Sequence, residues 1–338
     1  MQDEMSFIYK GILERICPEH PDIENINVSR DKYKMRCVLR ARNISQPYFA
    51  LVNSESALLR IIESCPFPCV SKPLSGSGSY LIRKNDSPIE LQESYLELKE
   101  IFEQGQHAPF LEQPFLLVEQ YLPGKDFHVE GIIDNGQIRI LACHEKLSAF
   151  ISDNSFSPAI SISPPISLDR ANTNKIEESV IQTISILKID NTVFNVDLRF
   201  DGNQTTIIEV NPRLGGATIR QTILELTGLD AVELHVQLAL GEHVNWPVSN
   251  SSKTNCLYRI PITKSGLVSN IGGIDISKKD LDVCGFVLNY QVGDYIKFDK
   301  KKADNHFGYA HVVSDTPQHA LQAMKNLITN LKIEISGN

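Results

Sequence analysis

Apolar residues recur with a helical period in several parts of the chain. In residues 174–187, Ile176, Val180, Ile181 and Ile184 lie at three- and four-residue spacings, which places their side chains on one side of a helix. The same kind of pattern, with its start and stop signals, predicts helices over residues 31–43, 55–63, 88–104 and 317–331, and one or two helices over residues 218–240 that break around Gly228.

Other segments alternate apolar and polar residues, as strands do. Residues 194–200 alternate, reach a turn at 201–203 and return as residues 205–210, which predicts a hairpin. An apolar run at residues 115–122 enters a Pro-Gly turn and a second alternating run, and from about residue 246 the chain changes to short strands. With 338 residues, 42% of them hydrophobic, the chain can bury a sizeable core divided into two or three subdomains.

The end of the predicted hairpin carries oxygen ligands. Because side chains alternate along a strand, Glu209 and Asn211 project together, and pairing across the hairpin brings Asp197 near Glu209. Carboxylate and amide oxygens, together with substrate phosphates, are the ligands that Mg²⁺ prefers. The alternative interpretation is a strand that ends in a Pro-Gly turn with a surface glutamate.

A second segment combines a lysine with a loop rich in glycine and serine. A short apolar strand ends at Lys72 and opens into the loop that contains Gly76 and Gly78. Such a loop can turn its backbone N–H groups toward a phosphate, and the lysine adds a positive charge. The loop matches neither common phosphate-binding glycine motif, and the alternative is a flexible hairpin.

A third segment, residues 115–133, has the form of a linker between two strands. Its backbone can face an adenine edge, while Glu119 and Asp126 can accept hydrogen bonds from an amino group and from ribose hydroxyls. An ordinary hairpin with solvated acids is the alternative.

In this order, the three segments resemble the ATP-grasp superfamily over roughly residues 29–245. The resemblance implies an α+β ATP-grasp fold, in which two α+β lobes clamp the nucleotide, with a small C-terminal α+β subdomain. It implies that Lys32 and Lys72 contact phosphates, that a hinge holds adenine and that one acid, Asp126, and one histidine, His128, lie near the ribose. The nucleotide-binding positions that it implies are Lys32, Lys72, Gly76, Ser77, Gly78, Glu119, Tyr121, Leu122, Asp126 and His128. The metal ligands that it implies are Asp197, Glu209 and Asn211, and the catalytic residues are Arg213 and Lys146.

The resemblance also implies a domain plan and an activity. We expect a short N-terminal segment at 1–30, as the remnant of a preceding domain, a small lobe at 31–118, a large lobe with the metal site at 119–245 and the C-terminal subdomain at 246–338. The implied activity is an ATP-dependent carboxylate-amine, or amino acid, ligase that forms an acyl phosphate and uses Mg²⁺ or Mn²⁺. A noncatalytic ATP-binding module, or a subunit completed by a partner chain, is the alternative, and a biotin-carboxylase-like carboxylation is a weaker one.

Composition narrows the expected partners. A net charge of −8 disfavours nonspecific binding to nucleic acid. No apolar run reaches the length of about 18 residues that a membrane span needs, and the first residues do not resemble a signal peptide, so we expect a cytoplasmic protein. Seven scattered cysteines favour neither a disulfide framework nor a zinc site. The expected partners are therefore small carboxylate and amine substrates, with a homodimer or a partner chain in place of the preceding domain.

Overall fold

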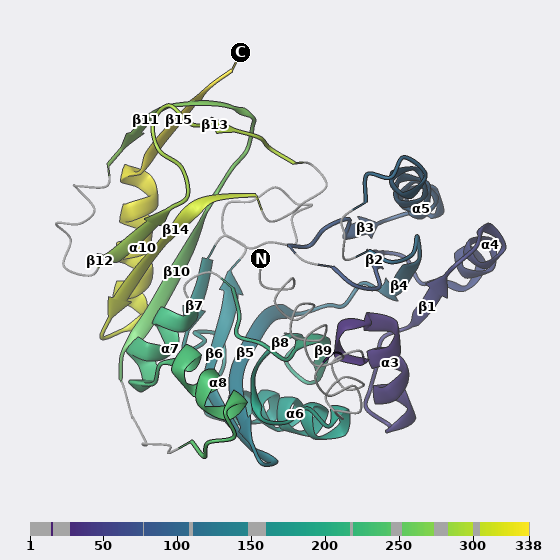
Figure 1. Cartoon of the computed structure of the whole chain (residues 1–338), viewed down its shortest axis with the longest axis horizontal. Helices are drawn as coiled ribbons and strands as arrows, with labels where there is room; N and C mark the ends of the chain where they lie inside the picture. Colours follow the sequence, from purple (N-terminus) through teal and green to yellow (C-terminus); the bar gives the residue numbers. More distant parts are fainter. Residues whose placement is uncertain are drawn as a thin grey trace.

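Three antiparallel sheets and their covering helices make up the described part of the chain (Figure 1). The computed structural model describes residue 15 and residues 28–76, 78–107, 111–147, 160–216, 219–244, 252–273, 283–299 and 305–337. This mixed α+β architecture agrees with the fold class expected from the sequence.

One of the three sheets has four strands. Its strand order is β1 (Phe49–Val52), β4 (Leu116–Gln120), β2 (Cys69–Pro73) and β3 (Arg83–Asn85). Helices α4 (Glu55–Ser64) and α5 (Pro88–Glu103) pack on it through a core that includes Leu58, Leu91 and Leu98. Each helix begins at a serine whose hydroxyl accepts a hydrogen bond from a backbone N–H of the first turn.

The largest unit is an eight-stranded sheet. Its strand order is β12 (Val283–Leu288), β14 (His306–Ser314), β10 (Thr254–Pro261), β7 (Ile160–Ser163), β6 (Gln137–Leu147), β5 (Lys125–Asp134), β8 (Thr192–Phe200) and β9 (Thr205–Asn211). Strands from the expected C-terminal subdomain thus continue the sheet of the expected large lobe, and the domain boundaries stay predictions. A third sheet contains β13 (Tyr295–Ile296), β11 (Gly266–Gly272) and β15 (Lys332–Ser336).

The two faces of the eight-stranded sheet are covered differently. Helices α6 (Arg170–Leu187) and α3 (Lys32–Ala41) bury one face near β5, β8 and β9, and α10 (Pro317–Asn330) covers the same face near β10 and β14. On the other face, α7 (Ile219–Thr227) and α8 (Ala231–Ala239) cover one end of the central strands. The remaining part of that second face carries polar side chains.

The chain passes twice between the large and the small sheet. Helix α3 packs into the core of the large sheet, so residues 42–48 form the first crossing, into β1. Residues 121–124 form the second crossing, from β4 back to β5. The two crossings are tied to the small sheet by backbone hydrogen bonds from Gln120 to Tyr48 and from Tyr121 to Pro68.

The helices predicted from the hydrophobic pattern are confirmed, with small shifts at their ends. Helix α6 begins at Arg170, a few residues before the predicted start, because Asp169 caps its first turn. The predicted break around Gly228 is real: α7 ends at Thr227, and Gly228 adopts a φ of 74°, which favours glycine.

Candidate functional site

The hairpin of β8 and β9 has the pairing that the sequence predicts. Asp197 lies opposite Glu209, and Asn195 lies opposite Asn211. Just beyond this pair the register shifts, because Leu198 pairs with Ile207 and Ile208 is an extra residue on β9. The shift lets Ile207 and Val210 join the core under α6 while Glu209 faces the other side. The two carboxylates are partly open to solvent, with exposures of 26% and 23%.

Each of these carboxylates forms an ion pair with a lysine from another element. Asp197 Oδ1 lies 2.5 Å from Lys146 Nζ of β6, and Glu209 Oε1 lies 2.8 Å from Lys32 Nζ of α3. The backbone N–H of Lys32 also donates to the carbonyl of Leu74, at the start of the glycine- and serine-rich loop. Three segments far apart in the sequence therefore meet at the end of this hairpin.

Lys72 and Glu119 form a second, buried ion pair between neighbouring strands of the small sheet. Lys72 Nζ lies 2.7 Å from Glu119 Oε2, and Arg36 Nε donates to Glu119 Oε1 at 2.6 Å. Burial alone would raise the pKa of Glu119, but the two cations lower it to about 2. Burial lowers the pKa of the Lys72 ammonium. Sequence reasoning missed Arg36, because its acidic partner is 83 residues away.

The second crossing is fixed to the large sheet by Arg199. Its guanidinium pairs with both carboxylate oxygens of Asp126, at 2.7 and 3.0 Å, and donates to the carbonyl of Leu122. The same guanidinium lies 4.8 Å from the centre of the Tyr121 ring. The segment that the sequence predicts to hold adenine and ribose thus has a defined position relative to the polar face.

His128 forms a buried stack with His144 next to Asp197. The two histidines are paired across β5 and β6, and their ring centres are 4.2 Å apart. Within the described residues, the Nε2 atom of neither ring has a hydrogen-bond partner. Burial lowers the pKa of His144 to about 3 and the pKa of His128 well below its usual value, so both rings are neutral at pH 7.

Glu130 is a residue of this face that the sequence reasoning missed. It is fully buried, accepts a hydrogen bond from Asn195 Nδ2 at 2.6 Å and accepts another from the backbone N–H of Gly215 at 3.1 Å. Burial raises its pKa to about 8. A Cβ on Gly215 would lie 2.2 Å from the Glu130 carboxylate, so a larger residue there would displace this carboxylate. The signal was present, because the strand period places Asp126, His128 and Glu130 on one face.

The structure describes the remaining expected site residues except one. Arg213 lies two residues after the end of β9, and its Nη1 donates to the carbonyl of Leu214 at 3.0 Å. Gly78 has a φ of 61°, as expected for a tight turn after β2. Ser77 lies outside the described residues.

A family model described as an ATP-grasp domain matches residues 65–222, the part of the chain that holds most of this polar face. This match identifies residues 65–222 as an ATP-grasp domain. Lys32 lies before the matched region, whereas Lys72, Asp197 and Glu209 lie inside it.

Known proteins similar to this chain include both curated relatives and solved structures. The uncharacterized protein y4rH of Sinorhizobium fredii is 25% identical over 319 residues, which is 94% of this chain and 63% of that protein. Human carnosine synthase 1 is 24% identical over 199 residues, which is 56% of this chain and 23% of that protein. The chain thus spans less than two thirds of the length of these relatives. The L-amino acid ligase of Bacillus licheniformis has the same fold, with a TM-score of 0.78 at 21% identity, covering 93% of this chain and 75% of that one.

The donor atoms of this polar face suit a hard cation only if substrate oxygens complete its coordination. Asp197 and Glu209 offer two carboxylates, and Asn211 lies one strand period beyond Glu209. Among the described residues, no group of three or more His, Cys, Asp or Glu side chains could hold a metal ion. Mg²⁺ is commonly held by one or two carboxylates plus phosphates, so this donor set fits it.

No helix in the described parts of the chain is long and apolar enough to cross a membrane.

Proposed function

We propose that this protein is an ATP-dependent ligase that joins a carboxylate to an amine, most simply between amino acids, and releases ADP and phosphate. One observation carries the proposal. Asp197 and Glu209 lie opposite each other on adjacent strands, and each is neutralised by a lysine from another element. Paired acids with nearby cations, partly open to solvent, are suited to a metal-bound triphosphate.

The positively charged side chains of the site would neutralise charge on the phosphates during phosphoryl transfer. Lys32 and Lys146 already lie within ion-pair distance of the two acids, so they are placed to move to phosphate oxygens once a metal ion binds the carboxylates. Mg²⁺ or Mn²⁺, held by Asp197, Glu209 and Asn211, would supply further charge neutralisation at the phosphates. Phosphoryl transfer depends mainly on positioning and on such neutralisation, and needs no covalent protein nucleophile.

The nucleotide would lie between the two sheets. Tyr121 and Leu122 form the crossing that would hold the adenine, and Lys72 with the loop of Gly76 and Gly78 would cover the phosphates. Asp126 and His128 are the residues proposed near the ribose. In the structure the Asp126 carboxylate pairs with Arg199, which fixes the position of its oxygens.

The reaction would proceed in two displacements. A carboxylate oxygen of the first substrate attacks the terminal phosphorus of ATP, and the bond to the ADP oxygen breaks. The amine of the second substrate then attacks the acyl carbon, loses a proton to solvent, and phosphate leaves. Arg213 and Lys146 would stabilise the negative charge on the transferred phosphate. The names of two similar proteins, carnosine synthase 1 and L-amino acid ligase, support amino acids as the substrate class.

The test is ADP release by the purified chain with Mg-ATP and pooled amino acids. We expect release that requires the amino acids and that is lost in Glu209→Ala. Glu233→Ala, which removes an exposed glutamate of α8, is the matched control and should retain the wild-type rate. Release that persists in Glu209→Ala would exclude this site as the catalytic centre.

Two further outcomes would redirect the proposal. ATP binding without turnover on any acid would favour the noncatalytic module, or a subunit that needs a partner chain. ADP release stimulated by bicarbonate instead of amino acids would favour the carboxylation alternative.

A further inference from the structure

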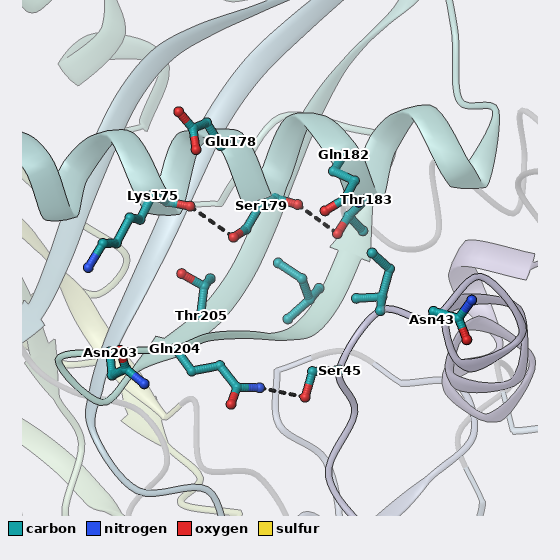
Figure 2. A pocket seen from close by; sticks show the side chains of 12 residues that line it. Asn43, Ser45, Lys175, Glu178, Ser179, Gln182, Thr183, Asn203, Gln204 and Thr205 are labelled. Atoms are coloured by element: carbon teal, nitrogen blue, oxygen red, sulfur yellow. Dashed lines mark hydrogen bonds between the residues drawn. The ribbon is translucent and has the colours of Figure 1, made fainter.

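A cavity lies behind the hairpin, on the face opposite to Glu209. It has a volume of about 500 Å³ and lies between α6, the turn from β8 to β9 and the first crossing at residues 42–48. Figure 2 shows Ser179 and Thr183 of α6 on one side, and Thr205, Gln204 and Ser45 across from them. Its volume falls within the usual range of small-molecule sites, about 300–1,000 Å³.

Uncharged hydrogen-bonding groups dominate the lining of this cavity. The hydroxyls of Ser179 and Thr183 donate to backbone carbonyls of their own helix, both at 2.8 Å, so their oxygens remain acceptors. The Oγ1 atom of Thr205 is buried and has no hydrogen-bond partner among the described residues, so it can both donate and accept. The amides of Asn43 and Gln182 add groups of both kinds.

The charged and apolar residues that line the cavity further restrict the chemical class of the ligand. One lysine and one glutamate, Lys175 and Glu178, contribute opposite charges, so the cavity has no net preference for an anion or a cation. Ile44 and Ile207 supply an apolar surface. A mixture of donors and acceptors beside aliphatic carbon matches hydroxyl groups on a carbon skeleton, because each hydroxyl both donates and accepts.

We propose that this cavity is a binding site for a small neutral polyhydroxylated molecule of sugar or polyol type. The site is separate from the nucleotide site and goes beyond the proposed ligase function, since it can be tested without ATP or turnover.

The cavity is joined to the nucleotide site by a short series of contacts. The carbonyl of Ile207, whose side chain lines the cavity, accepts a hydrogen bond from Arg36 at 2.6 Å, and Arg36 also holds Glu119, the partner of Lys72. The first crossing is connected to the same arginine, because Gln46 Oε1 accepts a hydrogen bond from Arg36 at 2.8 Å.

The first crossing also contacts the turn between β8 and β9 directly, since Gln204 donates to the hydroxyl of Ser45 at 2.6 Å. A ligand that contacts the first crossing would therefore restrict movement of the small sheet relative to the large sheet, and so would affect nucleotide binding between them. Linkage requires that nucleotide and ligand change each other's affinity by the same factor.

The first experiment measures binding of D-glucose, D-ribose and maltose to the full chain by calorimetry and saturation-transfer NMR, without ATP. L-alanine and inorganic phosphate serve as the zwitterionic and anionic probes. We expect at least one sugar to bind and the two charged probes not to bind in this cavity. Absence of sugar binding, or sugar binding that is unchanged by the variants below, overturns the proposal.

Two variants locate the binding. Thr205→Val replaces a buried unpartnered hydroxyl by a methyl group of similar shape, and should weaken sugar binding about three- to tenfold without loss of folding. Ser179→Ala should weaken it similarly. Ser185→Ala is the matched control, because the Ser185 hydroxyl also donates to a carbonyl of α6, at 2.9 Å, but lies outside the cavity. An equal effect of Ser185→Ala would contradict the location.

The coupling is measured by repeating the titration with a saturating non-hydrolysable ATP analogue and Mg²⁺. We expect sugar affinity to rise about fivefold or more, at the lower end of known coupling between sites. An unchanged affinity would contradict the link through Arg36.

Discussion

The two faces of strands β5 and β8 differ in nearly every property although they share one backbone. On the face under α6, Phe127, Val129, Val196 and Leu198 are almost completely buried in one apolar core. On the other face, the alternate residues are His128, Glu130, Asn195 and Asp197, all of which have polar side chains. The difference shows how a period of two lets one strand supply both stability and chemistry. Substitutions on the two faces should therefore fail in different ways.

The largest expected effect is on the apolar face. Phe127→Ala removes a buried ring from the core, and should lower the free energy of unfolding by about 3–5 kcal/mol. The rate of ADP release per folded molecule should stay near the wild-type value. Denaturant unfolding and active-site titration measure the two quantities, and a matching loss of rate would mean that the faces are not independent.

On the polar face, Asp197→Asn should show the opposite pattern. The change keeps the shape of the side chain but removes a charge beside Lys146, so we expect ADP release to fall about 10²–10³-fold with little change in stability. Binding of Mn²⁺ with ATP, followed by electron paramagnetic resonance, should weaken in parallel. If the midpoint of unfolding fell as far as for Phe127→Ala, Asp197 would be a structural residue.

Glu145 sharpens the comparison because it is a buried acid on the apolar face, paired with Phe127. Its Oε2 accepts from the backbone N–H groups of Ile166 and Ser167 at 3.0 and 2.9 Å. Glu145→Gln places an amide against these donors and should cost about 1–3 kcal/mol of stability. Lys125→Ala, which removes only the exposed partner of Glu145, should cost less than about 1 kcal/mol. A larger loss of stability in Lys125→Ala than in Glu145→Gln would show that the ion pair contributes more than the backbone hydrogen bonds.

The smallest effect concerns the stacked histidines of the polar face. Their pKa values are lower in the folded protein than in the unfolded chain, so unfolding takes up protons below pH about 6.5. For His144, stability is fully present above its unfolded pKa and is lost as the pH falls from about 6.5 toward about 3. In this window His144→Phe should reduce the slope of the unfolding free energy against pH by at most about 1.4 kcal/mol per pH unit. Unfolding free energies at pH 7, 6 and 5 measure the slope, and identical slopes would mean that His144 is not buried as a neutral ring.

The sequence was informative wherever a local period decides the structure. The helix over residues 174–187 and the hairpin that places Asp197 opposite Glu209 both follow from spacing within one segment. Contacts between distant segments could not be predicted in the same way. The hydrogen bond from Arg36 to Glu119 spans 83 residues, and nothing in the helical period of residues 31–43 indicates a buried acid as partner.

Glu130 is an intermediate case. Strand alternation alone places it on the same face as Asp126 and His128, but its burial depends on α7 and on the close approach of Gly215. The roles of the site residues in binding and catalysis stay predictions, which the variants above test.

The extra residue Ile208 on β9 decides which faces of the sheet its two neighbours reach. It offsets the strand by one residue, so Ile207 and Glu209, which would share a face in a regular strand, are directed to opposite sides. If Ile208 were paired into a regular ladder, either the glutamate would turn into the core or the isoleucine would turn into the site. Deleting Ile208 would instead make Ile207 and Glu209 consecutive residues, and strand alternation would still direct them to opposite faces. We therefore expect homologous sequences to tolerate both substitution and deletion at this position.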